Sequence, residues 1–160
     1  MNVLIDTIEV SLVPIERKEV LWNIYQLYLY DLNPLDGSLV LDDYGRYGCV
    51  NFDKYWSDEG RYPYLLTANG RLAGFVLVRA VDDTFEIAEF FVMRRARGKG
   101  VGATMAARVF ELHKGKWKLS TQVINEAQHF WRKVVAKASG GKYKEKLIYN
   151  DKRVEWTFEA

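Results

Sequence analysis

The stretch EIAEFFVMRRARGKGVGAT, residues 86–104, decides how the rest of this chain can fold. Its first half, up to Met93, is mostly apolar and aromatic, which is the composition of a buried strand. Residues 103–112, which follow the basic middle part, are good helix formers throughout. Between strand and helix lies a turn with three glycines, namely Gly98, Gly100 and Gly102. The pattern therefore predicts a strand, a glycine-rich turn and a helix in direct succession.

A turn of this kind can bind a phosphate group. The first backbone N–H groups of a helix have no partner within the helix, and the helix dipole adds partial positive charge there. Glycines allow a phosphate to approach the backbone closely. Four basic side chains surround the turn, namely Arg94, Arg95, Arg97 and Lys99. The turn is therefore predicted to bind a phosphate-bearing ligand, and the alternative is an ordinary crossover between strand and helix.

Two common phosphate-binding motifs do not fit. The Walker motif requires Gly-Lys followed by Ser or Thr, whereas Lys99 is followed by Gly100. The dinucleotide fingerprint requires the spacing G-x-G-x-x-G, whereas the glycines here are spaced G-x-G-x-G. The sequence therefore argues against both a Walker-type and a Rossmann-type nucleotide site.

A third pattern does fit, Arg/Gln-x-x-Gly-x-Gly/Ala, read as Arg97, Gly100 and Gly102. With the aromatic strand before it and the helix after it, this stretch resembles the signature of the GNAT superfamily of N-acetyltransferases, and especially that of the diamine N-acetyltransferases. The resemblance implies acetyl-CoA as cosubstrate, bound by main-chain groups. It assigns the pantetheine arm to Phe90, Phe91 and Val92. It assigns the pyrophosphate to the turn, residues Gly98, Lys99, Gly100, Val101, Gly102 and Ala103.

The remaining pattern predicts the order strand, two helices, three strands, helix, strand, helix and two strands. Expected strands are 8–13, 62–68, 71–79, 84–93, 117–124, 144–150 and 153–158. Expected helices are 16–32, a short one that Asn51 caps and that ends at 56 or 57, about 100–114, and 126–138. Residues 35–50 are expected to be loop with a short strand. This order is similar to the GNAT fold over the full length. We therefore expect a single α/β domain, 1–160, with a mixed, mostly antiparallel twisted sheet, splayed strands and flanking helices.

The family's second signature, Asn-x-x-Ala-x-x-Phe-Tyr, is matched only in part by residues 125–131. Asn125 lies one residue too close to Ala127, and it is expected either to bind the cofactor or to cap the following helix. Trp131 stands where the family has a tyrosine that commonly protonates the departing thiolate. An indole cannot serve in that role, so water or Tyr143 is the expected replacement.

Two glutamates of the first stretch are candidates for the general base, which must take a proton from the attacking amine. Glu89 lies three residues before Val92, where aminoglycoside-modifying relatives often carry an acid, and Glu86 resembles the glutamate of histone acetyltransferases. Strand alternation predicts that the two side chains face opposite sides of the sheet. Glu89 is preferred because it is nearer the splay, and an ion pair at the strand edge is its alternative role. The resemblance implies that the N–H of Val92 stabilises the oxyanion.

The region from Tyr25 to Tyr64 is acidic and aromatic. It contains eight of the ten tyrosines, and seven acids against three bases. Such a region can bind a cationic amine through charge and cation–π contacts. The candidates for acceptor binding are Tyr25, Tyr28, Asp31 and Trp56. The alternative is that these aromatic side chains form the apolar face of an amphipathic helix and its core.

Composition limits the remaining classes of function. The chain has 160 residues and a net charge of +2, and no apolar run approaches the roughly 20 residues of a membrane helix. The N-terminus lacks the features of a signal peptide, and Cys49 cannot form an internal disulfide, so we expect a cytoplasmic protein without membrane attachment. Two histidines are too few for a metal site, and no metal is expected.

The expected function is the transfer of an acetyl group from acetyl-CoA to a primary amine of a small, cationic acceptor. The alternatives are a protein or peptide N-acetyltransferase and an acyl-CoA-binding module without turnover. A nucleic-acid module ranks last, although the segment from Arg94 to Lys118 has eight bases against one acid, because it lacks stacking aromatics on a shared strand. The resemblance also allows a homodimer formed through the final strands.

Overall fold

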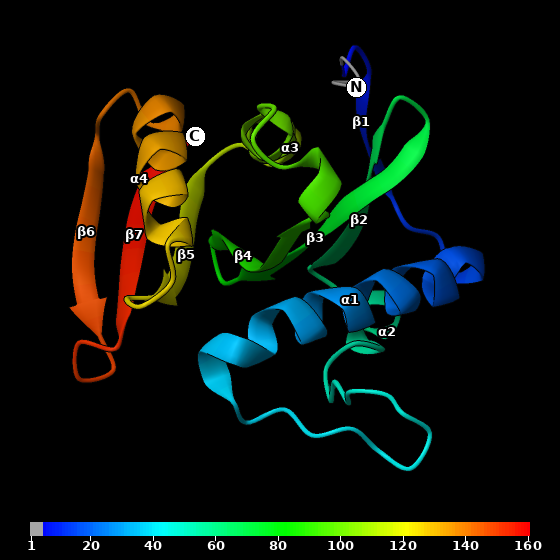
Figure 1. The fold of residues 1–160 in the computed structure, drawn as a ribbon. Helices are drawn as coiled ribbons and strands as arrows, with labels where there is room; N and C mark the ends of the chain where they lie inside the picture. Colours follow the sequence, from blue (N-terminus) through cyan, green and yellow to red (C-terminus); the bar gives the residue numbers. More distant parts are fainter. Residues whose placement is uncertain (1–4) are drawn as a thin grey trace.

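The structure, a computed structural model, describes residues 5–160, apart from the side chains of residues 34–36. In this part of the chain seven strands form one sheet in the order β1-β2-β3-β4-β5-β7-β6 (Figure 1). The strands are β1 Ile8–Leu12, β2 Arg61–Ala68, β3 Arg71–Val81, β4 Thr84–Val92, β5 Lys116–Gln122, β6 Tyr143–Ile148 and β7 Arg153–Glu159. Among these strands, only the pairing of β4 with β5 is parallel. This is the mixed, mostly antiparallel sheet that the sequence predicts.

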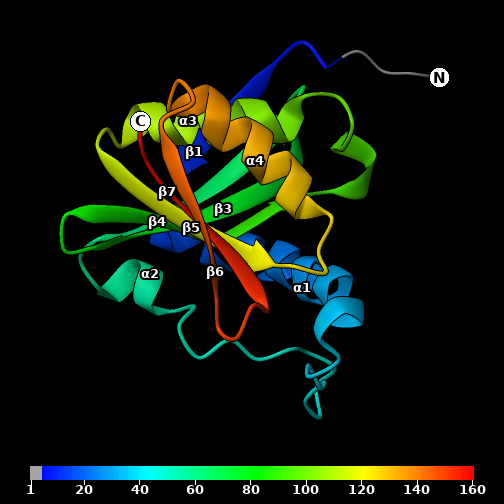
Figure 2. The same cartoon turned by 90° about the vertical axis from the view of Figure 1, so that its left-hand side faces the viewer.

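Helices cover the two faces of the sheet (Figure 2). The helices are α1 Lys18–Asp36, α2 Lys54–Ser57, α3 Val101–Leu112 and α4 Ala127–Ala138, with short 3₁₀ helices at Ile15–Arg17 and Arg94–Ala96. Helices α1 and α2 lie on one face, and α3 and α4 lie on the other. Each face has its own core: Leu21 and Phe75 belong to the α1 side, whereas Met105, Trp117 and Trp156 belong to the α3–α4 side. Burial of these apolar side chains is the main favourable term in folding.

Helix α1 is longer than the sequence predicts. The expected end was near residue 32, ahead of Asn33 and Pro34, but the helix continues to Asp36. Gly37 ends it in the left-handed conformation, with φ 69° and its N–H bonded to the carbonyl of Asn33 at 2.7 Å. A glycine in that conformation is a strong helix stop. A residue that precedes a proline, here Asn33, prefers extended backbone. The stop at Gly37 nevertheless decided where the helix ends.

Other predicted boundaries are also wrong, since β6 ends at Ile148 and not at residue 150, and β3 continues to Val81 and not only to residue 79. Asn51 does not cap the short helix, because α2 begins at Lys54 with Asp53 in the cap position, and the Asp53 carboxylate instead pairs with Lys18 at 2.6 Å. Strand β5 ends at Gln122 and not at residue 124, where Ile124 is 70% exposed. The short strand expected within residues 35–50 is reduced to one isolated bridge between Leu41 and Tyr47.

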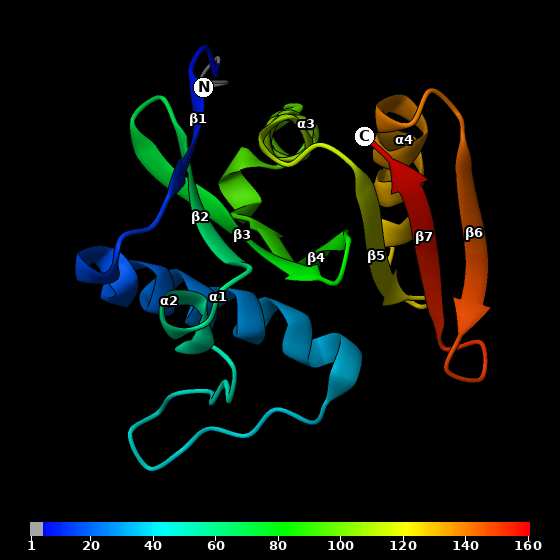
Figure 3. The same cartoon turned by 180° about the vertical axis from the view of Figure 1, so that it is seen from behind.

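Strands β4 and β5 separate along their length. They pair only at three positions, Thr84 with Lys116, Phe85 with Trp117 and Glu86 with Lys118, although β4 continues to Val92 and β5 to Gln122. Figure 3 shows the two strands diverging, with β7 and β6 beyond β5. The expected splay is therefore present, and it opens the sheet between the two helical layers.

The opposite edge of β4 is tightly bound to β3. Its pairs run from Thr84 to Val92, with a register shift because Leu77 pairs with Glu89 whereas Val78 pairs with Ile87. Ala88 is therefore the extra residue of a β-bulge. The bulge changes the face of the sheet toward which the following side chains point. At Gly74 a Cβ atom would lie 2.1 Å from the carbonyl oxygen of Phe91, so only glycine permits this close approach.

Candidate functional site

A cavity of about 270 Å³ lies where β4 and β5 separate, and it spans the sheet from the α4 side to the α1 side. Its wall on the α4 side is mostly apolar, with Ile87, Phe90, Leu119 and Trp131. Its wall on the α1 side is polar, with Tyr28, Glu89, Ser120, Gln122 and Arg153. The division follows strand alternation, because Leu119 packs into the α4-side core while its neighbours Ser120 and Gln122 face the other way.

The glycine-rich turn leads from the end of β4 into α3. Gly98 and Gly100 both have left-handed backbones, with φ 73° and 74°. The N–H of Thr104 bonds the carbonyl of Gly100 at 3.0 Å, and it opens the hydrogen-bond ladder of the helix. The N–H groups of residues 101–103 therefore have no partner within the helix. These groups could hold a phosphate, as the sequence predicts for a turn of this composition.

Gly102 lies where α3 comes close to α4 and to the end of β4. A Cβ atom there would lie 3.3 Å from the ring of Phe130 and 3.5 Å from Val92. Any larger side chain would crowd the junction between the turn, the end of β4 and α4.

Two arginines of the turn bind inward to α1. Arg97 donates to the carbonyl of Val92 at 2.7 Å and to Asp31 at 2.6 Å, and Arg94 donates to the same carboxylate at 2.8 Å. Partial burial raises the pKa of Asp31, but the hydrogen bonds from Arg97 and Arg94 outweigh it and hold that pKa below its usual range. Asp31, expected to bind an acceptor cation, is thus already neutralised by two guanidinium groups.

Glu89 lies partly buried in the polar wall of the cavity, where Tyr28 donates a hydrogen bond to its Oε2 at 2.5 Å. Burial raises the pKa of Glu89, while the Tyr28 hydrogen bond and the charges of Arg153 and Arg79 partly counteract that rise. Burial and the nearby carboxylate raise the pKa of Tyr28 well above its ordinary value, so Tyr28 stays protonated as the donor. A carboxylate with a raised pKa in a cavity is suited to accept a proton.

Glu86 faces the same side of the sheet as Glu89, which corrects the expectation that they face opposite sides. The bulge at Ala88 adds one residue between them, so a spacing of three residues returns to the same face. Glu86 is not part of the cavity wall. It accepts a hydrogen bond from Arg79 at 2.7 Å and lies 3.9 Å from Lys118, so this carboxylate is used in ion pairs.

Tyr25 and Trp56, expected at the acceptor site, belong to the core on the α1 side and not to the cavity wall. Tyr25 is 3% exposed and packs against Phe75 and Phe52. The indole of Trp56 donates to the carbonyl of Val13 at 2.9 Å. Of the four residues expected at the acceptor site, only Tyr28 lines the cavity, because Tyr25 on α1 and Trp56 on α2 pack in the core on the α1 side.

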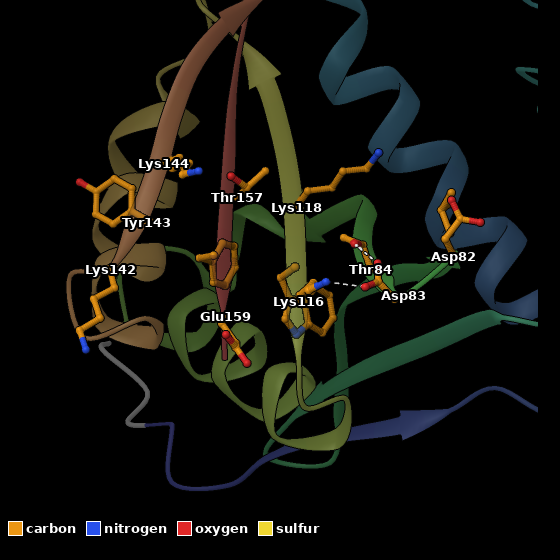
Figure 4. A pocket seen from close by; sticks show the side chains of 13 residues that line it. Asp82, Asp83, Thr84, Lys116, Lys118, Lys142, Tyr143, Lys144, Thr157 and Glu159 are labelled. Carbon is orange, nitrogen blue, oxygen red and sulfur yellow. Dashed lines mark hydrogen bonds and ion pairs between the residues drawn. The ribbon is translucent and has the colours of Figure 1, made fainter.

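Tyr143 lies at the opposite end of β5 from the cavity. It pairs with Phe158, which in turn pairs with Trp117 near the start of β5. There it lines a second, wider groove of about 790 Å³ together with Lys142 and Lys144 (Figure 4). The structure therefore does not bring Tyr143 to the cavity, where a replacement for the missing tyrosine would have to be.

Asn125 and Trp131 both line the cavity at the start of α4. The side-chain oxygen of Asn125 accepts a hydrogen bond from the N–H of Ala127 at 2.9 Å, which satisfies one free donor of the helix. Trp131 is buried, and Phe90 packs edge-on against it at 4.7 Å between ring centroids. The tryptophan therefore fills space in the apolar wall at the position where the family pattern has a hydroxyl group.

Four polar residues of the cavity wall were not foreseen, namely Ser120, Thr121, Gln122 and Arg153. Arg153 lies on β7, which pairs with β5. Its partner in the register of the two strands is Gln122. The amide oxygen of Gln122 is buried and has no hydrogen-bond partner among the described residues. The apolar residues Trp117 and Leu119, two positions apart, were the one signal that could have indicated the opposite face for Ser120 and Gln122.

Among the described side chains, which exclude those of residues 34–36, there is no group of three or more His, Cys, Asp or Glu that could hold a metal ion. Within residues 5–160, no helix has both the length and the apolar character that a membrane crossing requires.

The chain has the fold of known acetyltransferases. An acetyltransferase from Thermus thermophilus matches with a TM-score of 0.70 at 11% identity, over 99% of this chain and all of that chain. The PaiA N-acetyltransferase from Thermoplasma acidophilum, solved in complex with coenzyme A, matches with 0.66 at 12% identity, over 96% and 99%. The ribosomal-protein-S18-alanine N-acetyltransferase from Escherichia coli matches with 0.64 at 12% identity, over 96% and 94%.

Sequence comparison agrees with the fold. No curated protein matches the sequence significantly. The model of the Acetyltransferase (GNAT) family, however, matches residues 20–135, which is well over half of the chain and includes the glycine turn and the splayed strands. The chain therefore belongs to the GNAT family, and it is an acetyl-CoA-dependent N-acetyltransferase.

Proposed function

We propose that the chain acetylates the primary amine of a small acceptor, that the amine attacks the thioester directly, and that Glu89 accepts its proton. The observation that carries this proposal is the position of Glu89, which lies in the polar wall of a cavity whose other wall is apolar. Tyr28 holds the carboxylate, and burial raises its pKa above the ordinary value, which makes it a stronger base than an exposed glutamate.

The features of the α4 side fit acetyl-CoA. The free N–H groups at the start of α3 and the basic side chain of Lys99 suit a pyrophosphate. Along β4, residues 87–92 have no β5 partner, so main-chain groups of Phe90, Phe91 and Val92 can pair with the amide groups of a pantetheine arm. Asn125 adds a polar group to this side of the cavity. When bound, acetyl-CoA supplies the acetyl thioester.

The features of the α1 side support a small amine as the acceptor. A protonated amine is attracted by Glu89, which forms no ion pair with the bases of the described residues. Transfer of a proton from the amine to this carboxylate leaves the neutral amine that attack requires. Of the cation-binding set foreseen in the sequence, only Tyr28 lines the cavity, and Glu89 is the acid beside it. The cationic character of the acceptor is therefore required only at its amine. The volume of about 270 Å³ favours a small molecule over a folded protein segment.

The test is release of free thiol from acetyl-CoA in the presence of a panel of primary amines and short peptides, with N-acetylated product identified by mass spectrometry. We expect thiol release to depend on the amine and product to form with small amines. Tight binding of acetyl-CoA without amine-dependent release would instead indicate an acyl-CoA-binding module. Product formed only with peptides would indicate a peptide acetyltransferase.

A further inference from the structure

Arg153 occupies the polar wall of the cavity in a fixed orientation. Its Nε and Nη2 donate to the hydroxyl and the carbonyl of Ser120, at distances between 3.0 and 3.2 Å. These bonds anchor one edge of the guanidinium group on β5. The remaining nitrogen, Nη1, has no hydrogen-bond partner among the described residues, and the residue lines the cavity. A guanidinium nitrogen with free N–H groups in a cavity is a ready donor to an anion.

An ion pair with Glu89 does not account for the position of Arg153 in the cavity wall. No ion pair within 4.0 Å joins them in the described part of the chain, although Arg153 is close enough to lower the pKa of Glu89. The cavity thus presents one negative and one positive group that do not neutralise each other by contact. A molecule with only positive groups would meet repulsion from Arg153. A molecule with one positive and one negative group would complement both.

The bases on the surrounding face of the sheet are largely paired with acids. Arg79 and Lys118 both pair with Glu86, and Lys116 pairs with Asp83. The neighbouring groove contains acids as well as lysines (Figure 4). Arg153 is therefore the base that the cavity itself offers to an anion.

We propose that the acceptor is an amino acid or a similar small molecule that carries a carboxylate as well as the reacting amine, and that Arg153 Nη1 binds this carboxylate while the amine lies at Glu89. This inference rests on the proposed function. Arg153 is then a residue that determines specificity, whereas Glu89 acts on the proton.

The test compares acceptors that differ only in the carboxylate. The common α-amino acids, β-alanine and γ-aminobutyrate are each paired with the corresponding carboxamide, and kcat/KM is measured by thiol release. We expect the carboxylate form to be preferred by about tenfold or more, since a hydrogen bond to a charged group contributes that much. In Arg153→Gln this preference should fall to less than about threefold, mainly through a higher KM. Arg153→Lys should keep part of it, because the charge remains while the anchored geometry is lost.

Two comparisons separate this role from others. Lys144→Gln removes one positive charge from the same face outside the cavity, and it should leave the preference in place. If Arg153 acted only through Glu89, then Arg153→Gln would lower kcat/KM equally for both forms of each acceptor, and the inference would be overturned.

A binding measurement covers the case in which no amine of the panel is turned over. Calorimetric titration of the CoA-saturated protein with the same pairs should show binding of the carboxylate form that Arg153→Gln abolishes. Equal binding of both forms would overturn the inference. Turnover of the carboxamides as efficiently as of the amino acids would also overturn it, while leaving the proposed amine acetylation intact. The thermal midpoint of each variant verifies that it is folded.

Discussion

The two edges of strand β4 differ in how they are used. The edge toward β3 is paired from Thr84 to Val92, and Gly74 brings the backbones into close contact there. The edge toward β5 is paired only as far as Glu86, and beyond it the strands enclose the cavity. The paired edge holds Glu89 in place through its bulge, whereas the unpaired edge leaves main-chain groups for a ligand. One strand can thus position a reacting side chain and bind a cosubstrate because the two tasks use different edges.

The same contrast extends to the two sides of the cavity. The α4 side combines an apolar wall with the glycine turn, and the α1 side combines Tyr28, Glu89 and Arg153. Changes on the α4 side should therefore affect acetyl-CoA, whereas changes on the α1 side should affect the acceptor and its proton. The following substitutions test this separation.

Glu89→Gln should have the largest effect. Loss of the general base should lower kcat by about a hundredfold or more, with KM for acetyl-CoA nearly unchanged. Glu86→Gln is the matched control, because its carboxylate lies on the same face but outside the cavity wall. Steady-state kinetics of both variants show which of the two glutamates acts as the general base. If Glu86→Gln caused the larger loss, the assignment of the base would have to be reversed.

Gly100→Ala should weaken binding of CoA by about tenfold, since an alanine at positive φ disturbs the turn that leads into α3. Gly140→Ala provides a control with similar backbone strain, because both glycines have positive φ and no neighbour within 4 Å of an added Cβ atom. Both variants should lose about 1 kcal/mol of stability or somewhat more. Calorimetry with CoA should show weaker binding only for Gly100→Ala, and equal affinities would argue against a pyrophosphate site at the turn.

Tyr28→Phe should shift the pH dependence of catalysis. The Tyr28 hydrogen bond counteracts the effect of burial on Glu89, so its removal should raise the pKa of that carboxyl further. The acidic limb of kcat/KM reports the general base of the free enzyme and should therefore move to higher pH. Tyr25→Phe, one turn earlier in α1 and outside the cavity wall, should leave the limb where it is. An unshifted profile for Tyr28→Phe would mean that another group titrates.

Asp31→Asn should have the smallest effect and should change stability. The folded pKa of Asp31 lies below the unfolded value, so its contribution is present above about pH 4 and is lost as the pH falls through the folded pKa. Because both arginines are largely exposed, we expect a loss of only about 0.5–1 kcal/mol at neutral pH. Urea unfolding at pH 7 and pH 3 should show the difference from wild type shrinking at the lower pH. A difference that persisted at pH 3 would point to packing.

The parts of the site that could be predicted from the sequence are those whose conformation is set by residues close together in the chain. The glycine turn could be predicted because the backbone conformation of Gly98 and Gly100 and the free N–H groups of α3 arise within a few residues. The end of α1 was misjudged, because the preference of a residue before Pro34 competed with a helix stop at Gly37. Tyr25 and Trp56 were misplaced because an aromatic helix face for the core and one for a ligand have the same pattern.

The sequence by itself determined the order of the elements, the glycine turn and the family, since each follows from residue types at short spacing. Only the tertiary structure decided the chemistry on the acceptor side. The bulge at Ala88 turns Glu89 toward Tyr28, and the pairing of β5 with β7 carries Arg153 into the same cavity. Both depend on register and packing between segments that are far apart in the chain, and no local pattern specifies those interactions.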